Sequence, residues 1–203
     1  MEKKFYIIMG RSGGGKGTQA ELLKTYLESK GAENVLHVTT GGAFREFIKG
    51  EGFVSKQARE VNNAGGLQPE FLAIWNWTNI FINSVQENTT VILDGAPRKV
   101  IEMNAMHAVI PFLGYSKPIV IYIEVGRAWA KDRLNYRQAQ SEEKRADTSS
   151  DEEIEKRLSL FDEDIIPCIE KFVEDPRYTY IHVNGEQTVE EVQAELVAKL
   201  NLA

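Results

Sequence analysis

The chain has 203 residues and a formal net charge of −6, with an isoelectric point near 5.3. This length favours one domain with insertions, because two independent domains would each have only a small core. Hydrophobic residues make up 42% and charged residues 27%, a balance that excludes a disordered chain. The negative charge argues against nucleic acid as a partner, because Lys and Arg supply most of that affinity by neutralising phosphates.

The cysteine content excludes several kinds of site. Cys168 is the single cysteine, so the sequence predicts no internal disulfide, no zinc site and a reducing, cytoplasmic environment.

The apolar run near the N-terminus stops after Met9, far short of a membrane span, and favours a buried strand. We expect no membrane partner, and we expect a monomer because the sequence has no long apolar surface stripe.

Five short runs rich in β-branched and aromatic residues predict strands. In chain order they are Phe5 to Met9, Val35 to Val38, Thr90 to Leu93, Ile119 to Ile123 and Tyr178 to Val183. Several of these runs are apolar at consecutive positions, which is typical of strands covered on both faces. Helical patterns lie between them, so the sequence predicts an α/β fold with a five-stranded parallel sheet and helices on both faces.

The predicted helices are Gly17 to Ser29, Gly41 to Lys49, Ser55 to Asn63, Pro69 to Asn83, Val100 to Ile110, Ala128 to Gln138, Asp151 to Phe172 and Val189 to Leu200. The stretch from Gly41 to Asn83 has more helices than a simple crossover needs, and we expect an insertion that covers a substrate. Pro167 is expected to kink or divide the long helix after Asp151. The aromatic residues Phe71, Trp75 and Trp77 are expected to serve packing.

A glycine-rich segment separates the first predicted strand from the first predicted helix. Residues 10–18 read GRSGGGKGT, with glycines at the first and sixth positions and Lys16 at the seventh. Glycines let backbone N–H groups converge on phosphate oxygens, and the following helix directs its positive end at the same place. The segment therefore predicts a phosphate-binding loop, with Lys16 reaching the β- and γ-phosphates of ATP.

The residues around this loop also indicate how Mg²⁺ is held. Gly17 follows the lysine, where a Ser or Thr hydroxyl normally binds the metal directly. We therefore expect Mg²⁺ to be held through water and the nucleotide, with no direct protein ligand. Asp94 closes an apolar strand and fits the acid that contacts a metal-bound water. Arg98 follows the same strand, at the edge where parallel sheets bind ligands.

Two other classes of nucleotide-binding protein are excluded. Gly15 to Ala20 also fits a weak dinucleotide fingerprint, but that interpretation requires an acid at the end of the second strand. The segment Leu36 to Thr40 contains no acid. A GTP-dependent switch protein would have an Asn-Lys-x-Asp motif, and the chain has none. A kinase or an ATPase remains.

Several motifs, in the same order along the chain, resemble adenylate kinase. They are GKGTQA at 15–20, VTTGGAFRE at 38–46, NAGGLQPE at 63–70, VILDGAPR at 91–98, and RLNYR, KRAD and EEIEKRL between 133 and 158. The resemblance implies a three-layer P-loop kinase fold over residues 1–203, with a helical monophosphate-binding insertion at 39–68 and a short lid without zinc at 137–148. It also implies transfer of the γ-phosphoryl group from ATP to AMP, giving two ADP, with Mg²⁺ as cofactor.

The resemblance assigns a role to each matching residue. Implied ATP-binding residues are Gly13, Gly14, Gly15, Lys16, Gly17, Thr18, Arg133, Arg137 and Gln187, the last through its backbone. Implied AMP-binding residues are Thr40, Arg45, Gly66, Leu67, Gln68, Gly95, Arg98, Glu102, Arg145 and Arg157. Implied catalytic residues are Lys16, Arg98, Arg137, Arg145 and Arg157. Several arginines suit this chemistry, because phosphoryl transfer collects and spreads negative charge.

Four positions depart from the family pattern and keep alternatives open. Gly42 replaces an Asp, Ala96 replaces a Phe, and Thr148 replaces one of two lid acids. Glu102 stands where the family has Gln; its carboxylate only accepts hydrogen bonds and suits the two donors of guanine. Thr40 resembles the members that use AMP, which is therefore the favoured acceptor. The alternatives are a kinase for GMP, CMP or UMP, and a nucleotide-binding sensor with weak activity.

Overall fold

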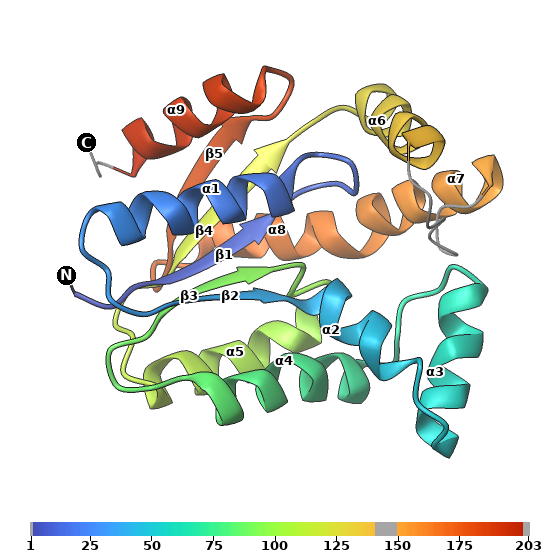
Figure 1. The fold of residues 1–203 in the computed structure, drawn as a ribbon, viewed down its shortest axis with the longest axis horizontal. Helices are drawn as coiled ribbons and strands as arrows, with labels where there is room; N and C mark the ends of the chain where they lie inside the picture. The colour runs from blue at the N-terminus through green and yellow to red at the C-terminus, as the bar shows by residue number, and fades with distance from the viewer. Residues whose placement is uncertain (1, 141–149, 201–203) are drawn as a thin grey trace.

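The computed structural model in Figure 1 describes residues 2–140 and 150–200. Its five strands form one parallel sheet in the order β2-β3-β1-β4-β5. The strands are β1 (Phe5–Met9), β2 (Val35–Thr39), β3 (Thr90–Asp94), β4 (Ile119–Glu124) and β5 (Thr179–Asn184). Each lies within one residue of its predicted run, so the predicted parallel sheet is confirmed.

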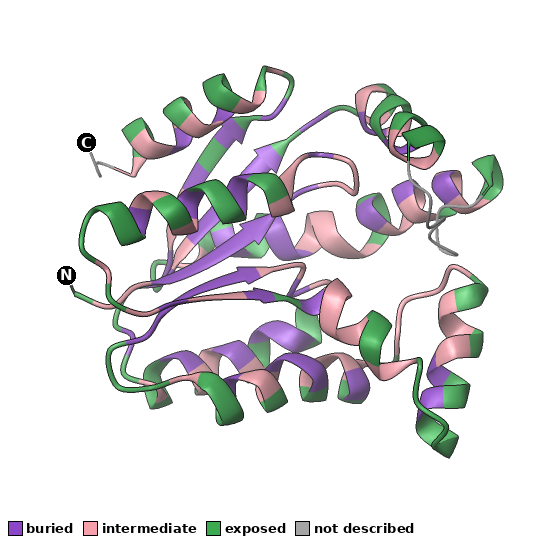
Figure 2. Cartoon of the chain, in the orientation of Figure 1, coloured by how far each residue is buried: buried purple, intermediate pink, exposed green. Residues whose placement is uncertain are grey.

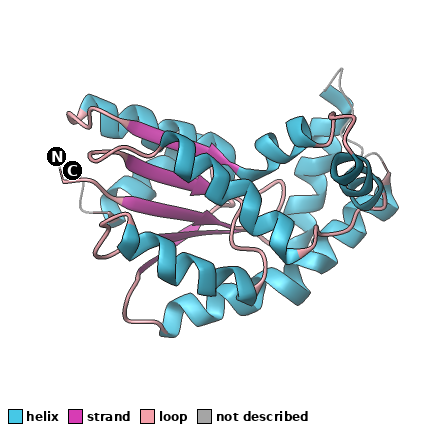
Figure 3. Cartoon of the chain, turned by 90° about the horizontal axis from the view of Figure 1, so that it is seen from below, coloured by secondary structure: helices cyan, strands magenta, loops and turns pink. Residues whose placement is uncertain are grey.

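Helices cover both faces of the sheet, as Figure 3 shows. On one face, α1 (Lys16–Ser29) and α9 (Val189–Lys199) pack over Tyr6 and Ile8 of β1. On the other face, α4 (Glu70–Ser84), α5 (Val100–Phe112) and α8 (Ile166–Glu174) pack over Phe5 and Ile7. Figure 2 shows the central strands as buried. The consecutive apolar residues of β1 thus supply both halves of the core.

Three chain segments meet at the carboxyl edge of the sheet. In the strand register, Ile8 of β1 and Thr39 of β2 both lie opposite Asp94 of β3. The loops that follow these three strands are therefore neighbours, although they come from distant parts of the sequence. Ligands of parallel α/β sheets bind at this edge, where loops diverge from adjacent strands.

The segment between β2 and α4 carries two short helices, α2 (Thr40–Phe47) and α3 (Phe53–Asn63). In Figure 1, α3 lies away from the sheet, at the side toward which the carboxyl ends of the strands point. This arrangement confirms the extra helices predicted for this part of the chain. The bounds 39–68 for a monophosphate-binding insertion remain a prediction.

The long predicted helix after Asp151 is divided, as the position of Pro167 indicated. It consists of α7 (Asp151–Leu160), a π-helical turn η2 (Phe161–Ile165), and α8, in which Pro167 lies in the first turn. Proline tolerates a first turn but opposes a regular helix on its N-terminal side. Helix α6 (Arg127–Gln140) packs against α7 through a small apolar cluster that includes Leu134 and Leu158. Among the described residues, no helix is long and apolar enough to span a bilayer.

Candidate active site

The glycine-rich loop follows β1 and ends where α1 begins. Gly13 has φ +86°, and a Cβ on it would lie 2.8 Å from the carbonyl oxygen of Ala130 in α6. A side chain is therefore excluded by both backbone conformation and space. Helix α1 begins at Lys16, so its N-terminal N–H groups face the loop and provide an anion-binding end.

Lys16 lines the site, among other cations. Its Nζ donates to the carbonyl oxygen of Arg11 at 2.9 Å. Burial lowers the pKa of Lys16 to about 8, an effect that the carboxylate of Asp94 opposes. Three arginines lower the pKa of Lys16 further: Arg157, Arg98 and Arg137. These arginines of distant sequence position thus lie close enough to act on one ammonium group.

A second loop, after β3, is held against the start of α2. The hydroxyl of Thr40 donates to the carbonyl oxygen of Gly95 at 2.9 Å. Gly95 has φ +92°, and a Cβ on it would lie 2.6 Å from that hydroxyl. Asn76 of α4 donates to the carbonyl oxygen of Thr40 at 3.0 Å. Arg98 donates from Nε to the Gly95 carbonyl at 2.9 Å, which fixes the direction of its guanidinium.

Arg45 and Arg98 converge over Gly41. A Cβ on Gly41 would lie 3.3 Å from a terminal nitrogen of Arg45 and 3.8 Å from one of Arg98. Two guanidinium groups that approach the same point suit a phosphate, because each offers a planar pair of donors. The glycine leaves space that a side chain would fill.

Arg157, which lies on α7, contacts the glycine-rich loop. Its Nε donates to the Ser12 hydroxyl at 2.6 Å. On α6, Arg133 lies over the ring of Trp129, with its guanidinium carbon 5.7 Å from the ring centroid. Both Arg133 and Arg137 line the same cavity as Arg157. Arg145 lies outside the described residues.

These groups surround a cavity of about 750 Å³, a size typical of small-molecule sites. Its lining includes most of the residues expected to bind nucleotide: Gly13, Gly15, Lys16, Gly17, Thr18, Thr40, Arg45, Gly66, Leu67, Gln68, Gly95, Arg98, Glu102, Arg133, Arg137 and Arg157. Asp94 lines it as well. The structure therefore brings together residues that are spread along the chain from Gly13 to Arg157.

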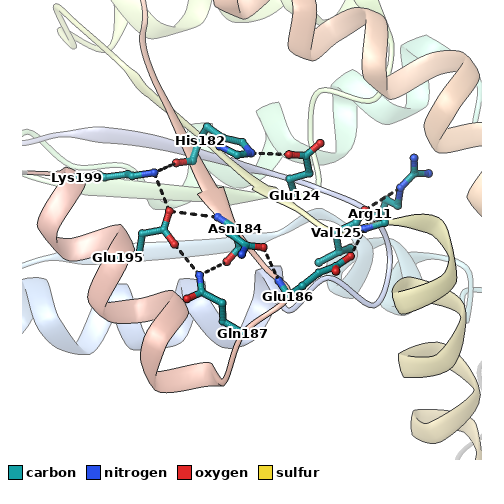
Figure 4. A network of polar contacts seen from close by, with 10 residues as sticks. Arg11, Glu124, Val125, His182, Asn184, Glu186, Gln187, Glu195 and Lys199 are labelled. Carbon is teal, nitrogen blue, oxygen red and sulfur yellow. Dashed lines mark hydrogen bonds and ion pairs between the residues drawn. The ribbon is translucent and has the colours of Figure 1, made fainter.

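Gly14 and Gln187 line a small neighbouring cavity, together with Arg133 and Trp129. Figure 4 shows the polar contacts that hold the Gln187 side chain. Its amide nitrogen donates to the Asn184 carbonyl at 2.9 Å and to Glu195 at 2.7 Å. The side-chain amide of Gln187 is thus held by protein acceptors, and the expected backbone contact of this residue with ATP remains a prediction.

The residues at the end of β3 fit a water-mediated magnesium ion. A Cβ on Gly17 would lie 3.6 Å from Oδ2 of Asp94, so this glycine leaves room beside the carboxylate. Among the described residues, no group of three or more His, Cys, Asp or Glu side chains forms a metal site. Mg²⁺ commonly binds through one carboxylate, waters and substrate phosphates, and the carboxylate of Asp94 lines the cavity beside Gly17 of the glycine-rich loop.

The model of the adenylate kinase family matches residues 8–176. The chain belongs to the adenylate kinase family. It is 30% identical over 192 residues to an adenylate kinase of Phocaeicola vulgatus, covering 95% of each chain. It is also 30% identical over 190 residues to one of Bacteroides thetaiotaomicron, covering 94% of each chain, and 28% identical over 201 residues to one of Stenotrophomonas maltophilia R551-3, covering 96% of this chain and 97% of the relative.

The family membership confirms the resemblance drawn from the motifs, and with it the P-loop kinase fold. Sequence reasoning assigned no role at the site to several residues that line the two cavities, among them Ser12, Asn76, Trp77 and Trp129. Ser12 and Trp129 each lie near a motif residue along the chain, and this proximity was the available signal. Nothing in the sequence indicated that Asn76 and Trp77 face the cavity.

Proposed function

We propose that this member of the adenylate kinase family transfers the γ-phosphoryl group of ATP to AMP and releases two ADP. The observation that carries the proposal is the convergence of Lys16, Arg98 and Arg157 on one cavity between the glycine-rich loop and the loop after β3. Phosphoryl transfer needs such a group of cations, because charge spreads over the transferred group and both bridging oxygens.

Each loop serves one substrate in this proposal. The N–H groups at the start of α1 and the ammonium of Lys16 hold the donor phosphates. Arg45 and Arg98, which converge over Gly41, hold the phosphate of AMP. Arg157 contacts Ser12 of the donor loop and lines the cavity that Arg98 also lines, where it stabilises the group in transit.

Catalysis in this arrangement is positioning and electrostatic stabilisation, with no covalent phospho-enzyme. When bound, Mg²⁺ neutralises charge on the donor phosphates, and Asp94 would hold it through water. The insertion 39–68 is proposed to cover AMP, and the lid 137–148, of which residues 141–148 lie outside the described part, to cover ATP. Covering both substrates excludes water and so opposes hydrolysis of ATP.

The setting proposed for the enzyme follows from its composition. We propose a monomer in the cytoplasm, with nucleotides as its ligands and no nucleic-acid partner. The buried free thiol of Cys168 suits a reducing compartment, and the net charge of −6 opposes binding to polyanions. Size-exclusion chromatography with light scattering measures the oligomeric state directly.

The test is a coupled assay of ADP formation from Mg²⁺ and ATP, with AMP, GMP, CMP and UMP offered separately. Rapid turnover with AMP alone supports the proposal. A preference for another monophosphate would replace AMP as the acceptor, and binding of ATP without turnover would indicate a sensor.

Two substitutions with matched controls locate the activity. Lys16→Ala and Arg98→Ala are each expected to lower kcat/KM by at least about a hundredfold, because each removes a group that stabilises transferring charge. The controls are Lys24→Ala, which changes a residue on the same helix as Lys16, and Arg177→Ala, which changes a surface residue. Both controls are expected to leave turnover intact. Equal losses in variants and controls would show that the cavity is not the active site.

A further inference from the structure

Glu102 is a buried carboxylate in the wall of the acceptor site. It lies in the first turn of α5 and is 3% exposed. One oxygen, Oε1, accepts from the backbone N–H of Arg98 at 2.9 Å and from that of Lys99 at 3.1 Å. The other oxygen, Oε2, accepts from the indole N–H of Trp77 at 3.3 Å. Both oxygens are thus tied to protein donors from two different elements.

These bonds limit what Glu102 can do for a bound base. A carboxylate offers about four lone-pair positions, and three of them are already directed at Arg98, Lys99 and Trp77. Turning the group to read a base would leave the buried indole N–H of Trp77 and two partly buried backbone N–H groups without partners, which costs more than a new bond returns. The carboxylate is better placed to hold the loop that carries Arg98.

Trp77 explains why a carboxylate stands at this position. Its side chain is 1% exposed, and an indole N–H donates but never accepts. A glutamine at position 102 has one oxygen and one NH₂ group in place of two acceptors. With the amide in either orientation, the NH₂ group would face an N–H donor, from Trp77 or from the backbone at Arg98 and Lys99.

We propose that Glu102 is a positioning residue that holds the backbone of Arg98, that Trp77 makes its carboxylate necessary, and that Glu102 does not select the acceptor base. The inference rests on the proposed function, because it assigns Arg98 to the acceptor phosphate. The loop is then fixed at two points: Glu102 holds the backbone N–H of Arg98, and the Gly95 carbonyl holds the Nε of Arg98.

The test is a cycle of four proteins: the unaltered enzyme, Glu102→Gln, Trp77→Phe and the double variant. Glu102→Gln is expected to lower kcat/KM for AMP about tenfold, which is the effect expected when one buried donor is left without an acceptor. The KM for ATP should change less than about twofold, because the donor site is untouched. The double variant is expected to recover about fivefold over Glu102→Gln alone, because Phe removes the opposing N–H. The ratio of kcat/KM for AMP to that for GMP should stay constant.

Matched controls are Trp75→Phe, on the same helix but outside the cavity lining, and Glu174→Gln, an exposed residue at the end of α8. If the losses of kcat/KM for AMP in the two single variants simply add in the double variant, Trp77 and Glu102 are not coupled, and this part of the proposal is overturned. A shift of acceptor preference in Glu102→Gln would identify this residue as the base reader and overturn the positioning role.

Failure of the proposed function would look different from failure of this inference. If the unaltered enzyme does not phosphorylate AMP, the proposed function is wrong. The same four proteins, unfolded in urea, then still measure the interaction between Trp77 and Glu102 without any turnover. A coupling near zero in that unfolding cycle would refute the pair itself.

Discussion

The lowered pKa of Lys16 predicts that ATP binding weakens as the pH rises above 8. In the free enzyme the pKa of Lys16 is about 8, chiefly because of burial. This corresponds to about 3 kcal/mol against the charged form, relative to a lysine in water. Phosphate oxygens beside the ammonium favour the charged form, so binding raises the pKa again. At pH 9 only about a tenth of the free enzyme carries a charged Lys16. The remaining molecules, in which Lys16 is neutral, must take up a proton when ATP binds.

The expected size of the effect follows from this linkage. Between pH 8 and pH 9.5 the dissociation constant of ATP should rise about 16-fold in all, and the slope should approach tenfold for each pH unit only above about pH 9. Isothermal titration calorimetry measures this with ATP, excess Mg²⁺ and no AMP, so that no turnover occurs. Two buffers with different ionisation enthalpies report the number of protons taken up, which should approach one at pH 9.

Lys16→Arg is the matched control, because a guanidinium stays charged across this range. Its affinity for ATP is expected to be lower at neutral pH, yet its dependence on pH should be flat. Other groups that titrate in this pH range are common to both proteins, so their contribution cancels. A flat dissociation constant in the unaltered enzyme, with no proton uptake at pH 9, would refute this account of Lys16.

Three further outcomes are expected. Gly95→Ala should lower the free energy of unfolding in urea by about 1–3 kcal/mol, because it combines a positive φ with a collision against Thr40; unchanged stability would contradict this. Trp129→Leu should raise the KM for ATP about two- to fivefold through loss of the contact with Arg133, and an equal rise for AMP would argue against that contact. Burial raises the pKa of Cys168 to about 12, so iodoacetamide at pH 8 should label it at less than about a hundredth of the rate in urea; rapid native labelling would show that the thiol is accessible.

The sequence predicted the elements well because their signals are local. A β-branched run, a glycine turn and an amphipathic helix each lie within about twenty residues, and the strands of the parallel sheet followed from them. The glycine-rich loop with Lys16 was predictable for the same reason. The division of the long helix was also local, since Pro167 alone indicated it.

The contacts that hold the site were not predictable, because they join distant segments. Arg157 and Ser12 are 145 residues apart, and neither residue type indicates the other. Trp77 was expected to serve packing, and it does, with 1% of its surface exposed. Its N–H, however, also determines which side chain fits at position 102. A single sequence shows which residues are present but not which polar groups meet in the core.

Two of the cations that line the cavity, Lys16 and Arg98, are held by neutral acceptors. Each donates to a backbone carbonyl oxygen, whereas Lys99, which also lines the cavity, pairs with the carboxylate of Glu70 at 2.8 Å. Arg127, outside the cavity lining, also pairs with a carboxylate. Neutral acceptors fix the direction of a cation without cancelling its charge, so the field remains available to phosphates. The cost of that arrangement is the mutual repulsion that, together with burial, lowers the pKa of Lys16, and binding of a polyphosphate relieves it.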